Sequence, residues 1–213
     1  MKYYDVTLDF SEDMLTFEGD PRPAIETVSS INEGAQYNLS LITFGSHTGT
    51  HIDAPLHFCR DGKAVDELGL EFFMGKAKVI ETLDPVSVKK EELIRHDIRK
   101  HDILLLKTEN TRRKLLSSRD FARDFCYMEK EAAEYLADIG IRTLGYDYLS
   151  PERYAFDHPW VHLALLGSGI VIVEGLVLEN VPPGEYEAVM LPMKIKGGNG
   201  SPVRAVLLQK EVG

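Results

Sequence analysis

The chain alternates short runs of apolar and β-branched residues with polar segments rich in glycine, proline and charge, and this pattern predicts more strand than helix. Residues 104–106 and 170–173 are continuously apolar, as expected for strands that are covered on both faces. The segments that we predict as strands are 3–8, 38–44, 77–83, 103–107, 142–146, 169–174, 187–195 and 203–209.

Three segments are predicted to form helices. Residues 89–95 follow Ser87, a plausible helix cap. Residues 129–139 carry apolar positions at helical spacing and are followed by Gly140, a residue typical of a helix C-terminus. A third helix is predicted to begin near Asp157 and to stop at Gly167. Together with the strands, these helices indicate an α/β fold with a mixed, strand-rich sheet core.

The composition is that of an ordinary globular protein. With 213 residues, 44% of them hydrophobic and 27% charged, the chain suits one domain spanning residues 1–213. The formal net charge of −10 argues against nucleic acid or an anionic membrane as the main partner. Two cysteines, no signal-like apolar stretch at the start and no apolar run of ~18 residues lead us to expect a cytoplasmic protein outside the membrane.

Two segments are candidates for binding loops. Residues 108–127 contain five basic side chains and no clear strand, so they are either a lid or a solvated connection. Their positive charge could select an anionic substrate. Residues 14–23 place Phe17 just before the turn Gly19-Asp20-Pro21.

The most unusual pattern lies in residues 47–58, where ligand-type side chains occupy alternate positions. Three imidazoles and a carboxylate therefore share one face of an extended chain, and apolar or β-branched residues share the other. Imidazole and carboxylate are the groups that bind zinc and manganese. A hydrogen-bonded structural cluster is the alternative. The alternating residues are His47, Gly49, His51, Asp53, Pro55 and His57.

The spacing of His47 and His51 predicts a bend between them. A helix is disfavoured because Gly49 separates them and β-branched residues flank it. A regular strand would separate them by about 13 Å, at ~3.3 Å per residue. Two nitrogens on one zinc at ~2.1 Å lie at most about 4 Å apart. We therefore predict a broken or bulged strand at Gly49 and Thr50.

The rest of such a site must come from a distant part of the chain. Glu174 closes an apolar strand, where a carboxylate is expensive unless it is paired or bound to a metal. His162 lies on the preceding predicted helix, and His158 is the competing ligand one turn earlier. Cys59 is either a soft ligand or a small buried hydrophobe.

At this point the chain resembles the cyclase family of metal-dependent hydrolases, whose best-known branch is the bacterial arylformamidases. The family motif is His-x-Gly-Thr-His-x-Asp-x-Pro-x-His-Phe, and residues 47–58 carry each fixed position. Further matches are residues 19–21, 131–136, 145–147, 162–174 and 200–205.

The resemblance implies a swivelling β/β/α-type fold, often dimeric, and a site for two divalent ions, with zinc favoured and manganese as the alternative. His47 and His51 would bind the first ion, and His162 the second. Asp53 and Glu174 would bridge the two. The last histidine of the motif, His57, would be the proton donor and acceptor.

The implied reaction is hydrolysis of N-formyl-L-kynurenine to kynurenine and formate. Two ions about 3.5–4 Å apart would share a water and lower its pKa to about 7, and His57 would pass its proton to the leaving amine.

Formamidases typically carry Trp where this chain has Phe17, which can still stack on an aryl substrate, and residues 146–151 differ from their Asp-x-Pro-Ser pattern. A sibling hydrolase that opens a cyclic amide, such as an isatin or a lactam, or cleaves another small amide or ester, is the alternative. A non-catalytic metal-binding protein is a third reading.

Overall fold

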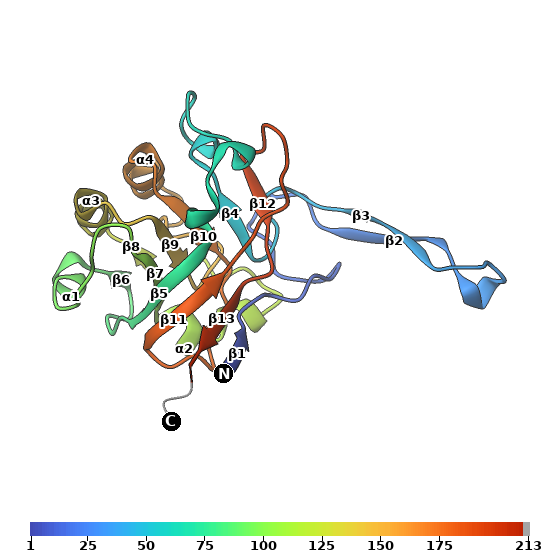
Figure 1. The fold of residues 1–213 in the computed structure, drawn as a ribbon, viewed down its shortest axis with the longest axis horizontal. Helices are drawn as coiled ribbons and strands as arrows, with labels where there is room; N and C mark the ends of the chain where they lie inside the picture. Colours follow the sequence, from blue (N-terminus) through green and yellow to red (C-terminus); the bar gives the residue numbers. More distant parts are fainter. Residues whose placement is uncertain (211–213) are drawn as a thin grey trace.

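A mixed β-sheet forms the centre of the computed structural model, which describes residues 1–210 (Figure 1). Within this range nine strands share one sheet, with four parallel strands in the middle and antiparallel strands on both sides. In spatial order the strands are β1 (Lys2–Asp5), β13 (Val206–Gln209), β11 (Gly184–Val189), β5 (Met74–Glu81), β7 (Ile103–Lys107), β9 (Thr143–Tyr146), β10 (Val171–Glu174), β4 (His51–Asp53) and β12 (Gly200–Pro202).

The parallel strands are apolar throughout because both of their faces are covered. Along β7, Leu104 and Leu106 point into one hydrophobic core, and Leu105 points into a second core on the opposite face. The first core is completed by α1 (Lys90–Leu93), α3 (Lys130–Ile139) and α4 (Trp160–Gly167), which lie together on one side of the sheet (Figure 1). The predicted α/β class with a strand-rich mixed sheet is confirmed.

A two-stranded hairpin, β2 (Ala24–Ser29) and β3 (Leu39–Thr43), projects away from the sheet (Figure 1). Nearly all of its strand residues are exposed, including Ile25, Leu41 and Ile42. The pattern predicted β3 but missed β2, although both strands are exposed on both faces.

Each predicted strand overlaps an observed one, but several boundaries were wrong. The segment 187–195 was placed too late, because β11 begins at Gly184 and residues after Val189 leave the sheet. The third helix begins at Trp160 and not near Asp157, since Pro159 restricts the residue before it to extended conformations. The pattern also missed three short strands: β6 (Ser87–Val88), β8 (Tyr127–Met128) and β12.

The segment 108–127 is ordered and buried at its start, whereas residues 112–114, 119, 120, 123 and 124 are exposed. It contains α2 (Glu109–Arg112) and a 3-10 turn, and its first residues are anchored by a buried carboxylate at the end of β9. Asp147 accepts hydrogen bonds from the backbone N–H and hydroxyl groups of both Thr108 and Thr111, at 2.5–3.1 Å. Across residues 1–210, no helix is both long and apolar enough to cross a membrane.

Candidate metal centre

The chain bends at Gly49, as the spacing of the histidines predicts. Gly49 has a φ of +68°, and β4 begins only at His51. The Nδ1 atom of His51 lies 2.9 Å from the carbonyl oxygen of Gly49, so this ring donates there and turns its Nε2 towards Asp53. Asp53 Oδ1 lies 2.6 Å from Nδ1 of His47 and 3.3 Å from Nε2 of His51. The bend thus allows both rings to reach one carboxylate.

Sheet pairing and one helix bring the distant residues to the same place. β10 runs antiparallel to β4 with Glu174 opposite His51, and Glu174 Oε2 lies 3.4 Å from Nε2 of His51. From α4, His162 places Nε2 at 3.4 Å from Glu174 Oε1 and 3.8 Å from Asp53 Oδ2. His158, the competing residue, packs its ring on Trp160 instead, with ring centroids 4.2 Å apart.

The five residues form two groups that share Asp53. His47, His51 and Asp53 make one group, and Asp53, His162 and Glu174 make the other, with ligand atoms within 4.8 Å of one another in each. Neither group includes Cys59, which is half-buried and free. The set contains only imidazole and carboxylate groups, it is largely buried, and it offers a shared carboxylate between two clusters. It therefore fits a pair of divalent ions.

The electrostatics of the cluster also suit cation binding. Burial opposes charge on His51, but hydrogen bonds to Asp53 and Glu174 raise its pKa to about 10. His162 is likewise buried, and hydrogen bonds to Glu152 and Glu174 raise its pKa to about 9. Burial alone would raise the pKa of Asp53, whereas hydrogen bonds from His47 and His51 hold it well below its usual value. The carboxylates therefore favour positive charge at the positions of His51 and His162.

A pocket of about 210 Å³ opens above this cluster, and His57 lies in it. The ring of His57 stacks on that of His47 with centroids 3.8 Å apart, but it belongs to neither ligand group. Burial lowers the pKa of His57 to about 4, so its imidazole is neutral at pH 7.

Aromatic side chains form the outer part of the pocket. Phe17 and Phe156 both line it, and Phe17 packs edge-on against Phe121 with ring centroids 4.9 Å apart. Phe121 comes from the segment 108–127, so this segment supports the pocket through an aromatic residue. Its basic residues do not line the pocket; each pairs with an acidic side chain, as seen for Arg112, Arg113, Lys114, Arg119 and Arg123.

The sequence reasoning missed three polar residues at or near the cluster. Asp20 lines the pocket, and burial raises its pKa. Asn199 places Oδ1 3.3 Å from Nε2 of His47. Glu152 is buried behind His162. Asp20 lies in the turn at residues 19–21, and Asn199 immediately precedes the block at 200–205, whereas no periodicity or spacing marks Glu152.

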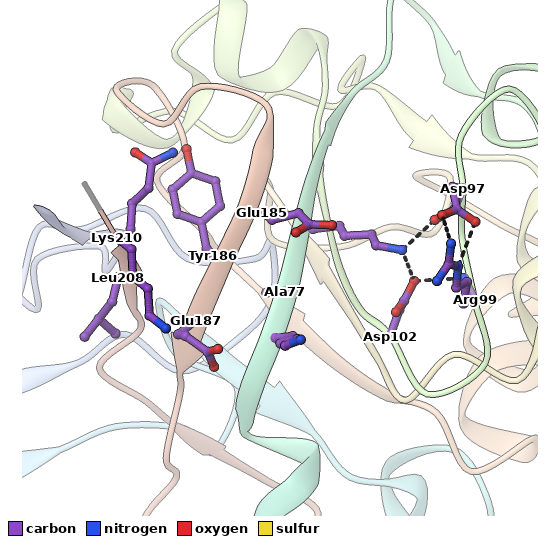
Figure 2. A pocket seen from close by; sticks show the side chains of 12 residues that line it. Ala77, Asp97, Arg99, Asp102, Glu185, Tyr186, Glu187, Leu208 and Lys210 are labelled. Atoms are coloured by element: carbon purple, nitrogen blue, oxygen red, sulfur yellow. Dashed lines mark hydrogen bonds and ion pairs between the residues drawn. The ribbon is translucent and has the colours of Figure 1, made fainter. Parts of the chain in front are cut away.

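A second pocket, of about 460 Å³, lies at the other end of the sheet against β5, β11 and β13 (Figure 2). Two ion pairs lie among its side chains: Lys78 pairs with Asp102 at 2.8 Å, and Arg99 donates to Asp97 at 2.9 Å. None of its lining residues is a histidine or a cysteine. The chemistry for metal binding and proton transfer is therefore in the smaller pocket.

The fold and the cluster define a candidate centre of the metal-dependent hydrolase class. The family model described as putative cyclase matches residues 4–153, and the chain belongs to this family. It is 37% identical over 210 residues to the kynurenine formamidase of Salinibacter ruber, with 97% of each chain covered.

Two solved structures share the fold. A potential metal-dependent hydrolase with cyclase activity matches with a TM-score of 0.85 and 34% identity, covering 99% of this chain and 98% of that one. Isatin hydrolase A from Labrenzia aggregata matches with a TM-score of 0.81 and 26% identity, covering 98% and 94% of the two chains.

Proposed function

We propose that this protein is a metal-dependent amide hydrolase that cleaves N-formyl-L-kynurenine to kynurenine and formate. The observation that carries the proposal is the convergence of His47, His51, Asp53, His162 and Glu174 beside a pocket that holds a neutral imidazole. Near-full-length similarity to a kynurenine formamidase supports the choice of an aryl formamide as substrate.

Five residues would hold the two metal ions. One ion would be held by His47 and His51 with Asp53, and a second by His162 and Glu174 with the same Asp53; we propose zinc in preference to manganese. When bound, such ions supply an activated water and polarise the carbonyl of the substrate.

His57 would transfer the proton in this reaction. Its ring lies in the pocket but outside both ligand groups, so it is free to take a proton and to deliver it to the leaving amine nitrogen. Phe17 and Phe156 would bind the aryl ring of the substrate by stacking. Proton transfer would therefore be carried out by His57, which is not one of the candidate metal ligands.

The test is hydrolysis of N-formyl-L-kynurenine by protein loaded with zinc or with manganese, with chelated protein as the control. Kynurenine release that depends on the ion supports the proposal. Two bound ions per chain without turnover would exclude this substrate and leave the hydrolase centre in place.

A cyclic amide is the second candidate substrate. The observation that favours it is Phe17, which stands where formamidases typically carry Trp, together with the similarity to isatin hydrolase A. Assaying isatin and simple lactams in parallel with the formamide distinguishes the two: the preferred substrate has the higher kcat/KM.

We further propose that the protein is a cytoplasmic homodimer whose hairpin β2–β3 contacts the second copy. Isolated two-stranded hairpins are marginally stable in water, yet this one carries large exposed apolar side chains, including Ile25 and Ile42, which face each other across the strands. The hairpin spans residues 24–43, and one partner contributes about 20–30 residues to a standard-size interface. Its chemistry therefore suits an apolar contact.

Sedimentation of an Ile25→Glu, Ile42→Glu double variant tests this arrangement. A shift from dimer to monomer supports it, whereas dimers as stable as those of the wild type contradict it. Leu83→Glu, a similar change at an exposed residue far along the chain from the hairpin, is the control.

A further inference from the structure

A buried carboxylate lies directly behind the candidate ligand His162. Glu152 is 5% exposed and lies on the segment between β9 and α4. Its Oε2 atom accepts hydrogen bonds from the backbone N–H groups of Val161 at 2.9 Å and His162 at 3.3 Å. The same oxygen lies 3.3 Å from Nδ1 of the His162 ring. Glu152 belongs to neither group of candidate ligands.

This contact decides which nitrogen of His162 faces the cluster. Since a carboxylate can only accept, the Nδ1 atom must carry the proton and donate it to Glu152. Nε2 is then left unprotonated in the neutral ring, and it points towards Glu174 at 3.4 Å and Asp53 at 3.8 Å. Phe58 stacks on the face of the same ring with centroids 4.4 Å apart, which prevents the ring from tilting.

The other group of ligands is held differently. The Nδ1 atom of His51 donates to the backbone carbonyl oxygen of Gly49, a neutral acceptor that no side-chain substitution removes. Among residues 1–210, the hydrogen bond behind the ring thus comes from a charged side chain at His162 and from a backbone carbonyl at His51. The two halves of the centre should respond differently when that charge is removed.

We propose that Glu152 is the positioning residue of the second metal site: its carboxylate fixes the tautomer and orientation of His162 and makes its Nε2 a stronger ligand. The proposal rests on the two-ion centre proposed above. Glu152 should affect the affinity for the ion held by His162 and Glu174, and it should not affect the affinity for the ion held by His47 and His51. Mutation of a hydrogen-bond partner behind a metal-binding histidine typically lowers metal affinity by about 10–100-fold.

The experiment compares stepwise metal binding by the wild type and Glu152→Gln, measured by competition with a chromophoric chelator for zinc and for cobalt. The glutamine has the same shape, and its amide oxygen can still accept from the backbone of α4, but it carries no charge. We expect the dissociation constant of one ion to rise about 10–100-fold while that of the other is unchanged. The control is Glu134→Gln, the same change on the exposed face of α3.

Glu152→Asp provides a second variant that keeps the charge. It should retain tighter second-ion binding than the glutamine variant, and it also serves if Glu152→Gln does not fold. Unchanged dissociation constants in both variants overturn the proposal. So does an equal loss of affinity for both ions that is accompanied by a lower melting temperature of the chelated protein. A wild-type protein that binds a single ion overturns it as well. A selective loss without formamidase activity in the wild type would retain this proposal and exclude the proposed substrate.

Discussion

Substitution of Gly175 by alanine should separate the two strands that carry the centre. Gly175 follows Glu174 at the end of β10, has a φ of +70° and faces the backbone at the bend before β4. A Cβ atom there would lie 2.5 Å from the carbonyl oxygen of Gly49 and 3.2 Å from Cα of Thr50. Both contacts are with backbone atoms, which cannot rotate away as the end of a side chain could.

The magnitude has two parts. A left-handed conformation costs an alanine about 1–2 kcal/mol. Displacement of packed backbone adds about 1–3 kcal/mol, the usual cost of overpacking. Gly175→Ala should therefore destabilise the protein by roughly 2–5 kcal/mol. The matched control is Gly140→Ala: Gly140 has a φ of +74°, but its Cβ would meet only the flexible chain of Lys100 at 3.6 Å, so the conformational cost alone applies.

Thermal and urea unfolding of both variants measure this difference, and metal titration reports on the site. Because Gly175 is adjacent to Glu174 and opposite the residues that lead into His51, the clash should also weaken metal binding by Gly175→Ala and leave it unchanged in Gly140→Ala. Equal destabilisation of the two variants, with wild-type metal affinity in both, would refute the reasoning.

Three further predictions concern the pocket. His57→Ala should keep its metal ions but lose about 100- to 10,000-fold in kcat, as measured by kynurenine release and metal analysis; near-wild-type turnover would contradict the assigned role. The raised pKa values of His51 and His162, about 10 and 9, give stability to the chelated protein that is complete below pH 6.5 and lost as the pH rises through 9–10. Chelated protein should therefore melt at a lower temperature at pH 10 than at pH 7, and a flat profile in calorimetry would count against these ion pairs. Phe17→Ala should raise KM for the aryl formamide with little change in metal content, whereas an unchanged KM would remove Phe17 from the binding surface.

Several features followed from the sequence because they depend on neighbouring residues. The apolar run of β7 predicted a strand covered on both faces, and α3 ended at Gly140 as its pattern indicated. The spacing of His47 and His51 required a bend, and Gly49 was the residue able to form it. In each case the cause is local: side-chain periodicity, or the conformation that one residue can adopt.

Only the tertiary structure decided which distant residues meet at the candidate metal centre. The antiparallel register of β4 and β10 places Glu174 opposite His51. The docking of α4 brings His162 next to Glu174, whereas His158, four residues away on the same segment, packs on Trp160. The pairing of the basic residues of 108–127 with distant carboxylates, and the place of Glu152 behind His162, are equally invisible along the chain. Such contacts join residues far apart in sequence or on separate elements, and their distances are fixed only when the sheet and helices pack together.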